Sequence, residues 1–526
     1  MPKNRIVVLF FLLFVYASRL PAAPQNNTEA PSLIENSLRA MGGEAVLRSI
    51  ATVSFKGIGH RYMLEQSERP EGPWLLDYFQ IHETRDLRRA RLRQVIESRG
   101  CNSTECWKSA QWSRSSTLIV SDHAAASVRE GTVSAGRASA VQLAEESLAL
   151  APERVLLLAR DAPDLHAEPD ISFHGFTHHV VAFTWEKKPV RIFLSGHTAL
   201  PSAVEITRSR PYEFFWSPWG DVTTRVCFAF WMLEPGGIHY PREWSYESNG
   251  QPDWTFMVNE LAFNPAVQEE DFAISEEVKK SFFARKRTVE DLSLGLSGSP
   301  AQEIAPGVVI VSGLWNVEEI RQSDGIIILE GPISSGYSKR VIDDARKRFP
   351  GLPIKAVIST SDAWPHIGGL REYAAVDIPI YALDLNRPIL ERLLSAPHRV
   401  EPDDLAAQVR PPRLVYVSQR TKLGEGVNAL EIIPLRTVTG ERQLFVYLPG
   451  SKILYTSDLF QRDSSGNFFL PQTVSEALDV VKREHLEVNL DIGMHLAPTP
   501  WTEVERVVAL VPGMPPSPAT ADPSPK

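Results

Sequence analysis

The segment from Pro353 to Leu370 contains the side chains best suited to chemistry. An apolar run predicts a strand over Ala356–Ser359, and a polar loop with Asp362 and His366 follows it. Carboxylate and imidazole groups are common ligands of divalent metal ions. A glycine pair then precedes a predicted helix over Gly369–Ala375. Because functional side chains concentrate in loops held by regular elements, this segment is the first candidate for a site.

This segment resembles the metal-binding signature THxHxDHxGG of the metallo-β-lactamase superfamily. In that family the loop presents three histidines and an aspartate to two metal ions, and the glycines let the next helix begin close by. Four further motifs occur in the order that the family requires, at Gly313–Val317, Asp324–Glu330, Leu448–Asp458 and Gly493–His495. The resemblance covers about residues 303–510 and implies an αββα sandwich that hydrolyses an ester, amide or thioester.

The resemblance assigns each ligand position of the family to a residue of this sequence. Most family ligands are replaced, and the replaced positions are Ser361, Ala363, Pro365 and Thr439. Ligand side chains remain at His366, Asp458 and His495. One metal site has therefore lost all of its own ligands, whereas the other keeps two histidines and the aspartate that bridges both sites.

The three remaining ligands leave alternative interpretations open. Two histidines and one carboxylate hold a single divalent ion with positions open to water, so the resemblance implies a mononuclear hydrolase with one zinc or iron ion. The alternative is a metal-free pseudoenzyme that binds a small molecule or a protein partner through the old cleft or the N-terminal sheet. In a further alternative, Asp362 or Asp384, which lie near the lost positions, restores a ligand.

The first half of the chain also contains a group of histidines, His174, His178 and His179. His178 and His179 are adjacent in a predicted strand, so their side chains point to opposite faces and cannot both bind one ion. We therefore expect a structural role for this group.

An aromatic cluster surrounds Pro218 and contains Tyr212, Phe214, Phe215, Trp216 and Trp219. Such a cluster either packs in a core or lines a groove for an apolar ligand. Core packing is the more common outcome, and both interpretations stay open at this point.

The elements before residue 288 predict a mostly antiparallel β domain over residues 30–287. A helix is expected at Pro31–Met41, and a helical insertion at Ala140–Arg160 with a break at Pro152. Strands are expected at Thr52–Gly59, Ile171–Phe173, His179–Trp185, Val190–Leu194, Ala203–Thr207, Val222–Trp231 and Trp254–Leu261. Around Gly237–Pro241 this half resembles, in architecture alone, the curved sheets of periplasmic lipoprotein carriers.

A Ser/Gly/Pro-rich linker is expected at residues 288–302, and strands then alternate with helices over 303–510. Expected strands are a pair formed by Val308–Val311 and Gly325–Leu329, then Ala356–Ser359, Ile378–Ala382, Ala429–Pro434, Leu444–Leu448 and Lys452–Tyr455. Expected helices are Tyr337–Phe349, Gly369–Ala375, Pro388–Leu394, Val474–His485 and Glu503–Leu510. The proline-rich tail 511–526 predicts disorder. The fold class is therefore α+β with two domains.

Residues 1–23 have the pattern of a secretory signal peptide, with basic residues, an apolar run over Ile6–Ala17 and a small-residue stretch. The apolar run is shorter than the roughly 20 residues of a membrane span, so we expect no transmembrane segment after its removal. The expected location is periplasmic or extracellular. A net charge of -9 without long charged runs argues against nucleic acid or anionic membranes as partners.

Export makes a disulfide between Cys101 and Cys106 plausible across their short polar loop, with two unlinked thiols as the alternative. Cys227 lies in an apolar run and is expected to be buried.

Overall fold

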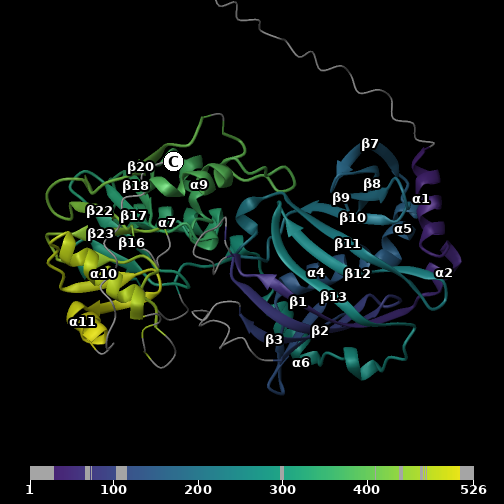
Figure 1. The fold of residues 1–526 in the computed structure, drawn as a ribbon. Helices are drawn as coiled ribbons and strands as arrows, with labels where there is room; N and C mark the ends of the chain where they lie inside the picture. The colour runs from purple at the N-terminus through teal and green to yellow at the C-terminus, as the bar shows by residue number, and fades with distance from the viewer. Residues whose placement is uncertain are drawn as a thin grey trace, which may run out of the picture.

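The computed structural model describes residues 29–64, 72, 74–101, 115–295, 301–408, 410–436, 442–462, 466, 468 and 471–509. Its strands form three sheets, of 13, 7 and 6 strands. The first sheet and its helices lie on one side of the molecule, and the other two sheets lie on the other side (Figure 1). The expected leader, the tail 511–526, Thr439 and Cys106 lie outside the described residues.

The 13-stranded sheet is antiparallel throughout, as the alternating patterns predict. Its order is β6-β5-β4-β3-β2-β1-β13-β12-β11-β10-β9-β8-β7. In chain order its strands are β1 (Thr52–Tyr62), β2 (Leu76–Asp86), β3 (Arg91–Cys101), β4 (Ser115–Ser121), β5 (Ala124–Arg129), β6 (Thr132–Ala135), β7 (His166–Phe173), β8 (Phe176–Trp185), β9 (Lys188–Ser195), β10 (Pro201–Arg208), β11 (Val222–Glu234), β12 (Ile238–Ser248) and β13 (Gln251–Phe263).

The sequence analysis missed strands β2 to β6, and β2 shows the reason. Its inward positions include Glu83 and Arg85, which are 2% and 1% exposed. Arg85 donates to Glu83 over 2.6 Å and lies over the ring of Trp244 at 4.9 Å. Charged residues that are paired inside a core interrupt the apolar alternation by which a strand is predicted.

Helices cover one face of this sheet. Buried residues of α1 (Glu29–Ala40), α4 (Ala138–Ala149), α5 (Pro152–Asp161) and α6 (Glu276–Arg285) share a core with the sheet. The short α2 (Glu44–Ser49) lies beside α5. The expected break at Pro152 is confirmed, because α5 begins there, where a missing N–H costs no helical hydrogen bond.

The seven-stranded sheet has the order β14-β15-β16-β17-β18-β19-β20. Its strands are β14 (Gln302–Ala305), β15 (Val308–Val311), β16 (Val317–Arg321), β17 (Ile326–Leu329), β18 (Ile354–Ser359), β19 (Ile380–Leu383) and β20 (Leu414–Val417). The expected pair of β15 with β17 is wrong, because β16 lies between them. Two adjacent glutamates, Glu318 and Glu319, made β16 look polar, yet both are 0% exposed.

The six-stranded sheet packs against the seven-stranded one. Its strands, in sheet order, are β21 (Thr421–Leu423), β22 (Leu430–Pro434), β23 (Leu444–Leu448), β24 (Ile453–Tyr455), β25 (Leu490–Gly493) and β26 (Leu496–Pro500). Apolar residues of both sheets, such as Ile327 and Val446, belong to one buried cluster.

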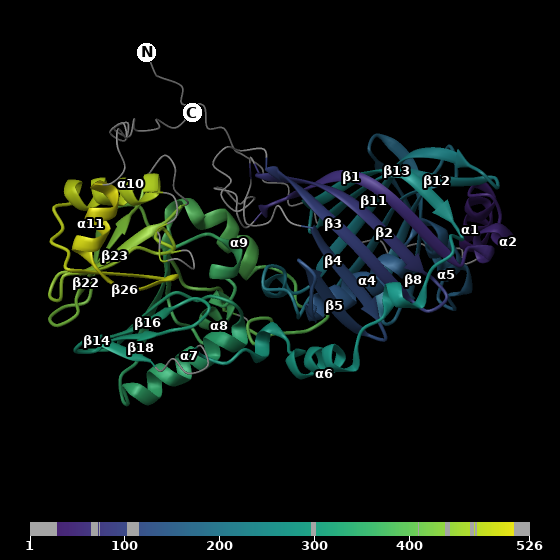
Figure 2. The ribbon, with the colours of Figure 1, turned by 90° about the horizontal axis from the view of Figure 1, so that it is seen from below.

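Helices lie on the outer sides of these two facing sheets (Figure 2). On one side are α7 (Ser335–Arg348), α8 (Leu370–Ala375) and α9 (Arg387–Leu394). On the other side α10 (Pro471–Arg483) and α11 (Trp501–Ala509) share a separate core with residues such as Phe445 and Leu454. The layers therefore follow the order helix, sheet, sheet, helix.

The expected linker begins with ordered structure. Residues Val289–Asp291 form a short turn, and Val289 is buried in the core of the second half. The side chain of Glu290 accepts a hydrogen bond from the backbone of Gly336 over 2.5 Å. Residues 296–300 lie outside the described residues. Within the described part of the chain, no helix has the length and apolar composition needed to cross a membrane.

Candidate metal centre

The loop that presents His366 connects β18 to α8. After Ser359 the chain runs to a short 3-10 turn, Trp364–His366, in which the His366 N–H donates to the carbonyl of Ala363 over 3.0 Å. Gly369 follows, and a Cβ at this position would collide with the Ser338 hydroxyl on α7. The glycine therefore lets α8 begin against α7, and this fixes where the loop ends.

The segments that carry Asp458 and His495 lie side by side. Asp458 follows β24, and His495 lies in the turn between β25 and β26. The N–H of Met494 donates to the carbonyl of Ser457 over 2.7 Å, so a backbone hydrogen bond joins the residues just before each ligand. Ser457 adopts a positive φ of 60°, which turns the chain toward the site.

The three side chains meet. One ligand atom from each of His366, Asp458 and His495 lies within 4.8 Å of the others. The Nε2 atoms of His366 and His495 are 3.4 Å apart, and His366 Nδ1 is 3.3 Å from Asp458 Oδ2. His366 and Asp458 are buried, at 4% and 7% exposure, and His495 is partly exposed.

The distance between the two imidazoles fits a shared metal ion. Two nitrogens that each lie about 2.0 to 2.1 Å from a tetrahedral ion are about 3.3 to 3.4 Å apart. The observed 3.4 Å matches this separation and exceeds the roughly 2.7 to 3.2 Å of a good hydrogen bond. Asp458 Oδ2 makes its 3.3 Å contact with the other ring nitrogen of His366, Nδ1, so the carboxylate is placed only by the 4.8 Å within which the three ligand atoms lie. The group is therefore a candidate site for one divalent ion.

Among the described residues, the replaced ligand positions do not rebuild a second site. Ser361 is buried and its hydroxyl accepts a hydrogen bond from the Ala363 N–H over 3.2 Å. Asp384 pairs with Arg436 over 3.0 Å. Within the described residues, one group of three or more His, Cys, Asp or Glu side chains could hold an ion, and it consists of His366, Asp458 and His495. Neither Asp362 nor Asp384 belongs to this group, so the alternative in which one of them restores a ligand is not supported.

Two supporting residues were not assigned by the sequence analysis. Gln443 is 1% exposed, and its Nε2 donates to Asp458 Oδ1, which holds the carboxylate in one orientation. Glu330, at the end of β17, contacts the hydroxyl of Thr360 and accepts from the Tyr455 hydroxyl over 3.1 Å. Burial raises the pKa of Glu330 to about 7. In the sequence, Glu330 is the last residue of the motif Asp324–Glu330 and directly follows an apolar strand, whereas Gln443 directly precedes one.

An indole forms a wall of the site. Trp315, in the loop between β15 and β16, has its ring centroid 5.8 Å from that of His366 and 6.1 Å from that of His495. Asn316 fixes this loop, because its Nδ2 donates to the carbonyls of Gly493 over 2.9 Å and Leu496 over 3.2 Å. The loop that carries Trp315 is therefore hydrogen-bonded to the turn that carries His495.

The other expected candidates are not brought to this site. His178 is buried and contacts the carbonyl of Phe176 and the hydroxyl of Ser202, whereas His179 pairs with Asp170. These contacts agree with the expected structural role. Cys227 is a free cysteine of intermediate exposure that packs against the buried cluster of Val180, Phe193 and Ala203, so the expected burial in a core is confirmed only in part.

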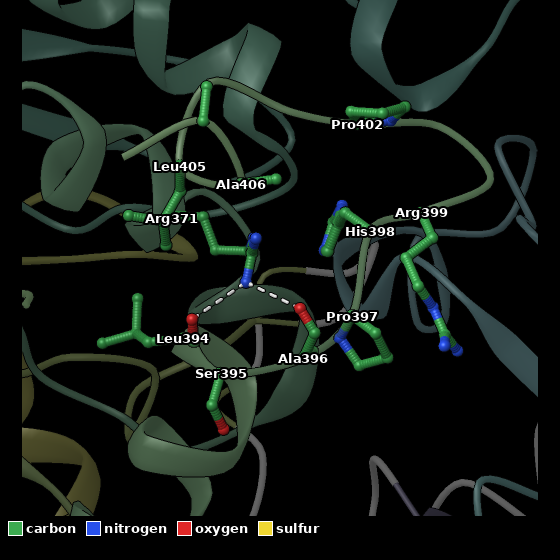
Figure 3. A pocket seen from close by; sticks show the side chains of 11 residues that line it. Arg371, Leu394, Ser395, Ala396, Pro397, His398, Arg399, Pro402, Leu405 and Ala406 are labelled. Carbon is green, nitrogen blue, oxygen red and sulfur yellow. Dashed lines mark hydrogen bonds between the residues drawn. The ribbon is translucent and has the colours of Figure 1, made fainter. Parts of the chain in front are cut away.

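A cavity of about 600 Å³ lies away from the three ligands, beside the segment Leu394–Ala407 (Figure 3). Arg371, which lines it, donates to the carbonyls of Leu394 and Ala396 and pairs with Asp403. His398 contacts the carbonyl of Pro218 over 3.2 Å. Because these charged and polar groups bind one another, the cavity offers no evident ligand chemistry.

No protein-family model matches the chain, and no curated protein matches its sequence. Among solved structures it is similar to a metallo-β-lactamase from Pontibacter korlensis, with 13% identity, a TM-score of 0.32 and coverage of 41% of this chain and 98% of that one. A metallo-β-lactamase from Hirschia baltica gives 17% identity, a TM-score of 0.31 and coverage of 40% and 95%. The DIM-1 metallo-β-lactamase gives 15% identity, a TM-score of 0.31 and coverage of 40% of this chain and 95% of that one. At these TM-scores the similarity supports no conclusion about activity. The function proposed below therefore rests on the geometry of the site.

Proposed function

We propose that this chain is an exported protein of two domains, residues 30–287 and 303–510, and that the second domain is a mononuclear metal-dependent hydrolase. The observation that carries the proposal is the meeting of His366, Asp458 and His495 from three separate loops at ligand distances. The leader pattern in residues 1–23 supports export. The layered arrangement of the two facing sheets supports the resemblance from which the three ligands were assigned.

The proposed reaction is hydrolysis at a carbonyl or phosphoryl centre. The oxygen of a water molecule bonds to the electrophilic atom, the bond to the leaving group breaks, and the leaving group takes up a proton. A divalent ion supplies Lewis acidity for such a reaction. His366, Asp458 and His495 would hold the ion, Gln443 orients the Asp458 carboxylate, and the Trp315 indole lies beside the two imidazoles.

A second candidate is a metal-free binding protein. The specific observation in its favour is that the polar groups of the site also contact one another, since Asp458 faces His366 Nδ1 at 3.3 Å and accepts from Gln443. A cluster that is satisfied in this way is stable without an ion. Metal content separates the two candidates.

The test is elemental analysis after incubation with zinc, manganese or ferrous iron and removal of free metal. Wild type is expected to retain one equivalent per chain, and His495→Ala none. His179→Ala is the matched control, because this histidine pairs with Asp170 on the first sheet, and it should retain one equivalent. Two tightly held equivalents would contradict the single site, and metal-free wild type would favour the binding protein. Hydrolysis of ester, thioester and phosphodiester substrates is then assayed on the loaded protein.

A further inference from the structure

Trp364 is a large buried side chain in the loop between β18 and α8, residues 360–369, here called the metal-site loop. It lies two positions before His366 in the same 3-10 turn and is 2% exposed. A large side chain so close to a ligand fixes the backbone that presents the ligand, provided that its own surroundings are rigid. The surroundings of Trp364 therefore bear directly on the position of the His366 imidazole.

Three aromatic rings around Trp364 come from the first half of the chain, and Arg392 of α9, in the second half, lies over the Trp364 ring at 5.7 Å. Residues 209–221 between β10 and β11, here called the aromatic loop, contact the Trp364 indole through three rings. Phe215 stacks on it, with ring centroids 4.2 Å apart and planes at 13°. Trp216 meets it edge-on at 5.1 Å, and Trp219 lies at 4.7 Å. Of the two alternatives for this cluster, core packing and a groove for an apolar ligand, the structure favours core packing. Trp216 and Trp219 are buried in the same core as the strands of the second half.

The aromatic loop is itself anchored on both sides. On its own sheet, Arg210 donates to the hydroxyls of Thr224 over 2.6 Å and Ser248 over 3.2 Å. On the other side, the carboxylate of Asp221 accepts from the backbone N–H groups of Arg399 and Val400, each over 2.9 Å.

Further contacts join the loop to the second half. The Asp221 N–H donates to the carbonyl of Pro397 over 2.7 Å, and Pro397 and Arg399 lie on the segment drawn in Figure 3. A Cβ at Gly368 would lie 2.8 Å from Pro218 Cγ, so the glycine allows the aromatic loop to approach the metal-site loop this closely.

The aromatic loop reaches the site by a second route. Phe214 contacts Trp315 edge-on, with ring centroids 5.5 Å apart. Trp315 in turn lies beside the rings of His366 and His495. Both the turn before His366 and the indole beside the two imidazoles therefore rest on aromatic side chains from the other half of the chain.

We propose that the aromatic loop is a positioning element for the metal centre, so that metal affinity is set across the junction between the two halves. Phe215, Trp216 and Trp219 hold Trp364, and Trp364 holds the His366 imidazole at its distance from His495. These are positioning residues, since none of them is a ligand. The inference rests on the proposed single metal site and adds that the second half alone does not complete it.

The experiment compares Phe215→Ala with Phe215→Tyr and Tyr212→Ala in the full chain. Phe215→Tyr keeps the stacked ring. Tyr212 belongs to the same loop but lies under Lys286, with 5.7 Å from the Nζ atom to the ring centre, and is the matched control. Zinc dissociation constants are measured by competition with a chromophoric chelator. Phe215→Ala should weaken binding by about 10- to 100-fold, as is typical for residues that orient ligands, while the other two variants bind as wild type does.

A second readout needs no metal. In the apo protein, His366 is 4% exposed and should react slowly with diethyl pyrocarbonate, as followed by mass spectrometry of its peptide. Phe215→Ala should speed this reaction several-fold, and Phe215→Tyr should restore the slow rate. The inference would be overturned if Phe215→Ala bound zinc as tightly as wild type and its His366 reacted slowly. It would also be overturned if Tyr212→Ala weakened zinc binding as much as Phe215→Ala does. Wild type that binds no zinc would overturn the proposed function, and the His366 reaction would still decide whether the aromatic loop positions this residue.

Discussion

The Nε2 atoms of His366 and His495 lie 3.4 Å apart, although 129 positions separate the two residues in the chain. Two features maintain this approach. The turn that carries His495 is tied to the Trp315 loop by Asn316, and the turn that carries His366 is packed around Trp364. The site is therefore built from the four segments that carry Trp315, His366, Asp458 and His495. We expect changes in residues that are not metal ligands to alter its affinity for a metal ion.

Gln443→Leu is expected to weaken zinc binding by about 10- to 100-fold, because the variant loses the donor that orients the Asp458 carboxylate. Gln461→Leu is the matched control, since Gln461 donates to the backbone carbonyl of Asp458 over 3.0 Å and not to its carboxylate. Chelator competition on both variants measures the effect. Equal affinities in the two variants would mean that Asp458 is not oriented through its side-chain oxygen, or that it is not a ligand.

Glu330→Gln should flatten the pH dependence of stability. Burial raises the pKa of Glu330 from 4.5 to about 7. The folded state thus keeps a proton that the unfolded chain releases, so the contribution of Glu330 to the free energy of unfolding falls as pH rises from 4.5 to about 7 and is constant outside that window. Between pH 4.5 and about 7, wild type should lose up to about 3 kcal/mol of its free energy of unfolding through Glu330, and the variant should not show this loss. Urea unfolding at pH 4, 5, 6, 7 and 8 measures this, and parallel profiles for the two proteins would contradict it.

Limited proteolysis should cut the chain near Gly295–Pro300 and leave two resistant pieces, because the expected linker is rich in Ser, Gly and Pro. Contacts such as those of Asp221 with the backbone of Arg399 and Val400 should keep the pieces together in native gel filtration. In Asp221→Ala the pieces should separate more readily. A single stable product that spans the linker would show that the domain boundary is wrong.

The mature protein should begin between Ser18 and Asn26 and be recovered outside the cytoplasm, because the leader pattern in residues 1–23 predicts cleavage there. N-terminal sequencing of the protein from its native host measures this. Met1 on the mature protein would exclude removal of a leader.

Local pattern was enough to predict many of the helices and strands. The helix break at Pro152, strand β15 and strand β23 were placed by apolar periodicity and by the special backbone of proline, which depend only on neighbours in the chain. Such signals are local, so the sequence carries them without the fold. His366, Asp458 and His495 were assigned differently, through the resemblance to the metallo-β-lactamase superfamily, whose motifs occur in order along residues 303–510.

Tertiary structure alone decided the rest. Strands β2 and β16 were missed because Glu83, Arg85, Glu318 and Glu319 look exposed in the sequence but are buried. A buried charge is tolerated only where partners satisfy it or where it takes up a proton. Arg85 pairs with Glu83 two positions before it, but it also contacts Ser147 and the Trp244 ring, and these contacts cannot be read from neighbouring residues. The stacking of Phe215 on Trp364 is decided in the same way, since the distance between two rings 149 positions apart (364 − 215) depends on how both halves of the chain pack.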